Sequence, residues 1–339
     1  MEKKKTCMCN NRAIHLPTRK LTRVHPIKLF FVLHLIIALA NLCTALDCQI
    51  NNSKPYKFAY TITIDQSGKG NFNAIQRAVD SIPANNAKWI HIKISPGIYK
   101  EKVQIPRNKP CIFIEGAGSK LTSIEFEDHE ESMTSATFIS YSDNIVVKGI
   151  AIKWQKFDSL VYVSQNKFVP LATPGRVIFR PAKAVMVNGD KTAFYQCAFF
   201  GIQSTLFDNK GRHYFKECYT EGAMDFIYGA GQSIYEQCDI SVNIGGYRKG
   251  ILSGFITAQK KESPKETNGF VFKNCTISGI GKASLGRAWG PYSTVIFANS
   301  TLSTVVEPKG WAPWRFVGGE GNFTYMESNN KGPGADISK

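Results

Sequence analysis

The segment AFYQCAFF, at residues 193–200, decides the fold because variants of it recur along the chain. Each variant has aromatic or aliphatic residues, a polar residue, a cysteine or serine, and then an apolar position. The later variants are HYFKECYT (213–220), SIYEQCDI (233–240), GFVFKNCTI (269–277) and VIFANSTL (295–302). The first three cysteines are 21 and 20 residues apart, and the next step of 37 is nearly two periods. A short β-rich unit therefore repeats about every 20 residues.

This period predicts an all-β protein, a right-handed parallel β-helix in which each repeat is one coil stacked on its neighbours. A leucine-rich horseshoe has a similar period, but it needs a recurring Leu-x-x-Leu-x-Leu pattern that this sequence lacks. Upstream, WIHIKI (89–94) and CIFI (111–114) alternate apolar positions and are expected to be strands of early coils.

One upstream segment breaks the strand pattern, because its apolar residues fall at helical spacing before Pro83. These residues are Phe72, Ile75, Ala78, Val79 and Ile82. We expect an amphipathic helix with Asn71 as its N-cap, covering the N-terminal end of the coil stack, where open strand edges invite pairing. At the other end, Gly332-Pro333-Gly334 and a polar tail predict no capping helix.

The start of the chain has the layout of a secretory signal. Residues 1–28 hold eight basic side chains and one acid, residues 29–42 are apolar, and Cys43-Thr44-Ala45 supplies small residues for cleavage. We expect a signal peptide at 1–45 and a single β-helix domain at 46–339. The run has about 14 residues, whereas a spanning helix needs about 20, which favours a cleaved signal. Because the basic leader is long, an uncleaved anchor is the alternative.

Composition narrows the class of protein and of partner. The chain has 339 residues, of which 43% are hydrophobic and 20% charged, which excludes a disordered tail and a multi-span membrane protein. The formal charge of +16 becomes +9 without residues 1–45. Such an excess of Lys and Arg favours an anionic partner: nucleic acid, a membrane surface or an acidic polymer.

Six cysteines remain beyond the signal segment, and they match no zinc spacing. They are Cys48, Cys111, Cys197, Cys218, Cys238 and Cys275. Cysteines on adjacent coils would lie close enough to be bridged, but an unbridged ladder in the core fits equally well.

The same period gathers chemical groups. Steps of 21 residues back from Asp225 reach Ser204 and Lys183, with Gln203 beside them. The apolar context GAMDFIYG (222–229) predicts a partly desolvated carboxylate that needs a cation, either Lys183 or Arg287. Without further support, the default interpretation of these residues is an ordinary surface acid, a solvated lysine and turn residues.

Several longer motifs resemble plant pectinesterases, the pectin methylesterases of the cell wall. They are GIYKEKV (97–103), GIQSTLFD (201–208), GRHYFKECYTEGAMDFIYGAGQSIYE (211–236), ITAQ (256–259), LGRAWGPYS (285–293) and GW..W (310–314). The resemblance runs from about residue 56 to 335. It implies a secreted cell-wall monomer acting on methyl-esterified homogalacturonan (pectin). It further implies a proteinaceous pectinesterase inhibitor as a second partner, and no cofactor, metal or nucleic acid.

The resemblance also implies roles for individual residues. Asp225 of DFIYG matches the nucleophile, Arg287 of LGRAW matches the arginine that orients it, and Gln203 matches a glutamine that holds the oxyanion. Trp289 matches a sugar-stacking tryptophan, and Phe207 and Tyr228 match aromatic residues that line the substrate groove.

Two central positions depart from the family pattern. The acid/base aspartate is replaced by Ser204, and the first oxyanion glutamine is replaced by Lys183. A serine hydroxyl cannot cycle as acid and base, a role worth about 10²–10⁴-fold in rate. Lys183 would stabilise an oxyanion by its charge or pair with Asp225 and blunt it. The chain also ends soon after GPGA (332–335), where the family pattern continues with a segment that packs along the helix.

Three functions therefore compete. The first is a pectinesterase of low or altered activity, and the second is a pectin-binding pseudoenzyme. The third is a β-helical polysaccharide lyase, which needs an acidic cluster to hold calcium, whereas the acids around 183–229 are scattered.

Overall fold

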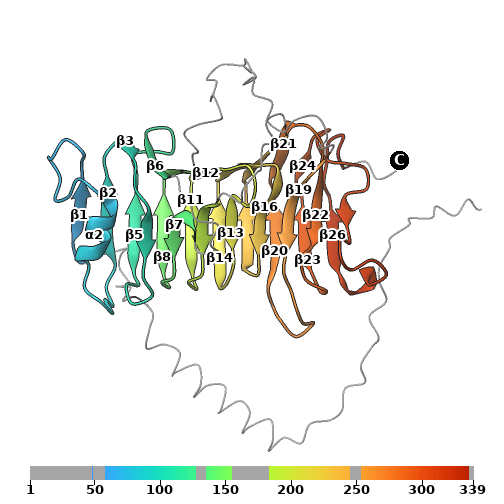
Figure 1. The fold of residues 1–339 in the computed structure, drawn as a ribbon, viewed down its shortest axis with the longest axis horizontal. Helices are drawn as coiled ribbons and strands as arrows, with labels where there is room; N and C mark the ends of the chain where they lie inside the picture. The colour runs from blue at the N-terminus through green and yellow to red at the C-terminus, as the bar shows by residue number, and fades with distance from the viewer. Residues whose placement is uncertain (1–47, 49–57, 127–134, 155–182, 245–252, 336–339) are drawn as a thin grey trace, which may run out of the picture. The chain divides into compact units, whose positions relative to one another are not determined.

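Short strands, paired in parallel with strands of the neighbouring coils, make up nearly all of the regular secondary structure in the described chain (Figure 1). The computed structural model describes residue 48 and residues 58–126, 135–154, 183–244 and 253–335. The predicted signal segment, 1–45, lies outside these residues. No helix in the described ranges is long and apolar enough to cross a membrane.

The strands form three parallel sheets, which the chain visits in turn. The first sheet has ten strands: β1 (Thr61–Ile64), β2 (Ile90–Ile94), β5 (Ile112–Glu115), β8 (Ile145–Lys148), β11 (Thr192–Tyr195), β14 (Arg212–Lys216), β17 (Gln232–Glu236), β20 (Gly269–Lys273), β23 (Thr294–Ala298) and β26 (Thr324–Ser328). The second has eight: β3 (Gly97–Tyr99), β6 (Thr122–Phe126), β9 (Ala151–Trp154), β12 (Ala198–Phe200), β15 (Tyr219–Gly222), β18 (Asp239–Asn243), β21 (Thr276–Ile280) and β24 (Thr301–Leu302). The third also has eight: β4 (Val103–Ile105), β7 (Ala136–Ser140), β10 (Lys183–Val187), β13 (Leu206–Asp208), β16 (Met224–Gly229), β19 (Gly254–Gln259), β22 (Ala283–Ala288) and β25 (Trp311–Ala312). The predicted right-handed parallel β-helix is confirmed.

Stacked aromatic rings fill the interior behind the first sheet. Phe215 and Tyr235 lie 4.5 Å apart with their planes 3° from parallel, and Tyr235 stacks on Phe272 at 4.5 Å. Phe272 continues the stack to Phe297 at 4.4 Å. These separations match the spacing of neighbouring strands, so the period places like residues above one another.

The repeated cysteines form an unbridged ladder next to this stack. Cys197, Cys218, Cys238 and Cys275 are buried free thiols. Cys218 Sγ–H donates to the Phe194 carbonyl of the preceding coil at 3.5 Å, and Cys238 Sγ–H donates to that of Phe215 at 3.4 Å. The residue before each cysteine has a positive φ, which turns the chain from the first sheet to the second.

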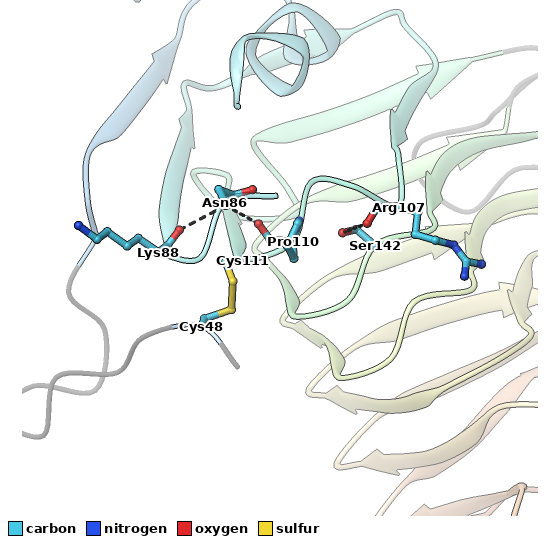
Figure 2. Close-up of a disulfide and its surroundings, with 7 residues drawn as sticks. All are labelled: Cys48, Asn86, Lys88, Arg107, Pro110, Cys111 and Ser142. Carbon is cyan, nitrogen blue, oxygen red and sulfur yellow. Dashed lines mark hydrogen bonds between the residues drawn. A yellow bond between two sulfur atoms is a disulfide. The ribbon is translucent and has the colours of Figure 1, made fainter. Parts of the chain in front are cut away.

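The other two cysteines are joined. A disulfide links Cys48 to Cys111 at the start of β5, with their Cα atoms 5.8 Å apart (Figure 2). Beside it, Asn86 Nδ2–H donates to the Pro110 carbonyl, and this bond fixes the turn that carries Cys111 (Figure 2).

The predicted N-terminal helix is present as α2 (Ile75–Ser81), at the β1 end of the stack (Figure 1). Its face of Ile75, Ala78 and Val79 is buried in the core. The predicted N-cap is wrong, because Ala74 holds that position and the Asn71 side chain accepts from Thr63 instead. The carboxylate of Glu101 accepts from the first two helical N–H groups, both at 2.8 Å. A residue of the next coil thus does the work expected of a local cap.

Candidate active site

The outer face of the third sheet holds the predicted site residues. Val185 pairs with Leu206 and Leu206 with Ile227, so β10, β13 and β16 are offset by 21 residues each. The Ser204 N–H donates to the Met224 carbonyl at 3.1 Å, one residue from Asp225. The structure therefore brings the backbones of Lys183, Ser204 and Asp225 together on three successive coils.

Ser204 and Asp225 share an unusual backbone conformation. Their φ angles are +61° and +46°, a region that non-glycine residues seldom adopt. Asp225 also lies where the register between β16 and β19 shifts, in an irregularity between Met224 and Ile227. Such local strain is concentrated at functional sites, and here it recurs at the same place in two coils.

The Asp225 carboxylate is held by Arg287 of β22. Arg287 Nε–H donates to Asp225 Oδ1 at 2.8 Å, and the Nη2 group donates to Oδ2, which makes a bidentate pair. The side chain of Asp225 is 16% exposed, and that of Arg287 is 17% exposed. Burial raises the pKa of the Asp225 carboxyl, and the hydrogen bonds and charge of Arg287 only partly offset this rise. Arg287, one of the two cations that the sequence offered, is therefore a partner of Asp225.

Two aromatic rings hold the guanidinium of Arg287. Its Cζ lies 4.5 Å from the ring centre of Phe255, on β19, and 4.1 Å from that of Trp314, in the loop after β25. Both distances are within the range of a cation–π contact. Arg287 is therefore fixed by its edge to Asp225 and by its faces to aromatic rings.

The three predicted aromatic residues cluster beside this pair. The rings of Phe207 and Tyr228 stack 4.5 Å apart, and Trp289 lies 5.6 Å from Tyr228. Phe207 and Tyr228 are only 2% and 8% exposed, which leaves the half-buried Trp289 as the most accessible of the three. Burial raises the pKa of the Tyr228 phenol, and the neighbouring Ser204 only partly offsets this rise.

The two residues assigned to the oxyanion lie in neighbouring coils, one register position apart. Gln203 is half-buried and forms an isolated bridge with Met224. Lys183 is buried, 6% exposed, at the start of β10 opposite Ala136 of β7. Within the described ranges, no group of three His, Cys, Asp or Glu side chains is placed to hold a metal ion.

Comparison with known proteins identifies the family. The family model described as Pectinesterase matches residues 61–158 and 167–339.

The chain belongs to the pectinesterase family.

Relatives within the family match over most of their length. Probable pectinesterase 55 of Arabidopsis thaliana is 44% identical over 90% of this chain and 88% of its own. Probable pectinesterase 29 of the same plant is 43% identical over the same shares. The solved pectin methylesterase from carrot has a TM-score of 0.72 at 24% identity, covering 86% of each chain. The resemblance found in the motifs is confirmed, and the carrot structure shows the same fold.

Two residues of this site in the pectinesterase-family chain, Phe255 and Trp314, were not predicted from the sequence. Phe255 had no signal, because the motif ITAQ that follows it drew attention to residues 256–259 only. Trp314 stood inside the quoted motif GW..W, but nothing in the spacing connected it with Arg287. The pairing of β22 with β25 brings Arg287 close to the loop that carries Trp314.

Proposed function

We propose that this chain is a pectin methylesterase of low activity that hydrolyses the C6 methyl esters of homogalacturonan to pectate and methanol. The observation that carries the proposal is the Asp225–Arg287 pair, in which a partly exposed carboxylate is held at both oxygens by one guanidinium. A fixed carboxylate beside an aromatic cluster suits attack on an ester of a sugar polymer. The family assignment favours an esterase over a lyase.

The proposed reaction runs through a covalent intermediate. An Asp225 oxygen attacks the ester carbonyl, the oxyanion collapses, the C–O bond to the methoxy group breaks, and methanol leaves with a proton from water. The hydroxide left by that proton transfer then cleaves the resulting anhydride, which returns the Asp225 carboxylate and yields the uronate carboxylate and one proton. Gln203 donates from its amide to the oxyanion, and Lys183 supplies a positive charge at the neighbouring coil.

Low activity follows from Ser204. The resemblance places an acid/base carboxyl there, and a hydroxyl does not exchange protons near neutral pH. The Tyr228 phenol that contacts Ser204 is no substitute, because its pKa is raised. Protonation of methoxide and activation of water are therefore left to solvent.

A second candidate function is pectin binding without turnover. The burial of Ser204 favours it, since this residue is only 8% exposed and a hydroxyl stands where the resemblance expects the acid/base carboxyl. Solved pectin methylesterases bound to hexasaccharides have the same fold, with TM-scores of 0.67 at 19% and 20% identity. The aromatic cluster with Trp289 is the surface we assign to the polymer.

The setting of this activity is proposed from the chain itself. The basic leader and apolar run in 1–45 support secretion to the cell wall. The basic composition suits a polyanionic polymer, and a proteinaceous inhibitor is the proposed second partner of the monomer.

The decisive experiment restores the missing carboxyl. Ser204→Asp in the purified, folded protein should raise methanol release from esterified pectin by about 10²–10⁴-fold, because it supplies an acid/base group beside Asp225. Ser204→Asp with Lys183→Gln should raise it further. The matched control is Ser278→Asp, at a half-buried serine of β21 in the second sheet, which should change nothing.

The outcomes separate the candidates. No gain from Ser204→Asp in a folded protein counts against an esterase site at Asp225. Absence of methanol from every variant, together with retention on a pectin column, identifies the binding protein. Unsaturated uronide absorbance that a calcium chelator abolishes would instead identify a lyase.

A further inference from the structure

Trp314 lies under two arginines. The Cζ of Arg287 is 4.1 Å from its ring centre and that of Arg315 is 4.4 Å away. The two guanidinium carbons are thus no farther apart than the sum of these distances. Arg315 is therefore a second positive charge that shares the ring of Trp314 with Arg287, the partner of Asp225.

The two arginines differ in what their N–H groups bind. Arg287 gives two donors to Asp225 and is 17% exposed. Arg315 is exposed, and among the described residues no carboxylate lies within ion-pair distance of it. A guanidinium that stacks through its face keeps its donors in the plane, at the edge, where they match the two oxygens of a carboxylate. Trp314 thus positions the Arg315 guanidinium, whose in-plane N–H groups are left for a carboxylate.

A second cation over a site tryptophan provides the contrast. Lys260 Nζ lies 5.3 Å from the ring centre of Trp289, but it is already paired with Glu262 at 3.3 Å. The charge at Arg315 has no such neutralising partner within the described ranges, although it lies close to Arg287.

The arrangement around Trp314 is costly to maintain. Two like charges over one ring repel each other, and Trp314 itself has a φ of +51°, in a region that non-glycine residues seldom adopt. An anion at the edge of Arg315 would relieve the repulsion. Strained, charged positions of this kind are typical of ligand sites.

We propose that Arg315 binds the free carboxylate of a uronate unit near the one being demethylated, so that the site prefers pectin that is already partly de-esterified. This inference rests on the proposed function, because it assumes that the polymer lies across Asp225. It assigns to Arg315 a role in substrate selection rather than in chemistry.

Equilibrium binding tests the inference without turnover. The full chain and Arg315→Ala are titrated calorimetrically with a fully de-esterified oligogalacturonate and with the fully methyl-esterified oligomer. Arg315→Ala should bind the de-esterified oligomer about five- to tenfold more weakly and the esterified oligomer unchanged, the loss expected of a partly exposed charge-assisted contact. Arg315→Lys should recover part of the loss, and the loss should shrink at high salt.

A matched control removes one charge elsewhere. Arg77→Ala takes away an exposed arginine of α2, at the opposite end of the coil stack, and should leave both affinities unchanged (Figure 1). Equal weakening by Arg77→Ala would show that only net charge matters, which overturns the inference. Equal loss for both oligomers in Arg315→Ala would also overturn it, because the residue would then act through Trp314.

The binding and turnover results together test the Arg315 subsite and the proposed esterase activity separately. Methanol release by the wild-type chain with unaltered binding in Arg315→Ala keeps the esterase and removes the subsite. Selective loss of the de-esterified oligomer without any methanol release keeps the subsite and removes the esterase. Failure of the wild-type chain to bind either oligomer removes both.

Discussion

Two carboxylates on successive coils of the third sheet each pair with a cation, and the two pairs differ in burial and in their hydrogen-bond partners. Asp208, at the end of β13, is fully buried; its Oδ1 contacts His213 Nδ1, and its Oδ2 accepts from the Tyr235 hydroxyl at 2.7 Å. Asp225, in β16, is 16% exposed, and Arg287 is its observed partner. A fully buried carboxylate bonded to two residues stabilises the coil. A partly exposed carboxylate held by one guanidinium keeps a face for a ligand.

His213 completes the buried pair. Its Nδ1 faces the Asp208 carboxylate, and its Nε2 lies 2.9 Å from the Gly189 carbonyl. Because both partners are acceptors, this geometry favours a proton on each ring nitrogen, which is the imidazolium form. Burial lowers the pKa of His213, but the charge of Asp208 and the bonds to Asp208 and Gly189 raise it more, so the net shift is upward.

The largest expected effect comes from breaking the buried pair. Asp208→Ala should lower the free energy of unfolding by about 3–5 kcal/mol, because it strands a buried cation and the Tyr235 hydroxyl. Asp225→Ala should lower it by less than about 1 kcal/mol, since Arg287 keeps contact with water and with Phe255 and Trp314. Urea denaturation followed by circular dichroism measures both. Equal losses in the two variants would remove the distinction between the pairs.

A pH series should show a smaller effect in two separate windows. The folded-state pKa of His213 lies above its ordinary 6.5, so its contribution to stability is complete below that pH and is lost as pH rises through the folded value. The folded-state pKa of Asp225 lies above its ordinary 3.8, so stability is lost in an acidic window while the nucleophile becomes ionised. Stability should therefore fall with pH in both windows, and activity should rise through the lower one.

Asp208→Asn isolates the upper window. It removes the charge that holds the proton on His213, so the loss of stability above neutral pH should move to lower pH or disappear. An unchanged slope above neutral pH in thermal melts would mean that His213 is neutral in the folded protein.

The two pairs were not equally accessible from sequence. The uniform step of 21 residues from β10 to β16 placed Ser204 and Asp225 together, because coils of equal length stack equal positions. Beyond β16 the coils are longer, since Ile227 pairs with Thr257 and Thr257 with Gly286, so counting does not reach Arg287. Asp208 and His213 lay within quoted motifs, but their contact depends on a turn that periodicity does not describe.

Local rules failed where a distant residue supplied the partner. Asn71 had the composition of an N-cap, but Glu101 of the next coil reaches the helix first. Phe255 illustrates the same limit at the site, because its contact with Arg287 joins two strands whose pairing the repeat did not predict.

Phe255 also provides the smallest of the expected effects, which tests how the Asp225–Arg287 pair is held in place. Phe255→Ala removes one of the two rings that hold Arg287, so the guanidinium should orient Asp225 less well. We expect kcat to fall by about three- to tenfold, with KM nearly unchanged, as for the loss of a partly exposed cation–π contact. Phe255→Tyr should restore kcat, and measurement in the Ser204→Asp background keeps the rates readable. The matched control is Phe200→Ala, since Phe200 is also half-buried, with the Lys153 ammonium 5.7 Å from its ring centre on the second sheet. An equal fall in kcat for Phe200→Ala would mean that general loosening of the coil, and not the seat of Arg287, limits the reaction.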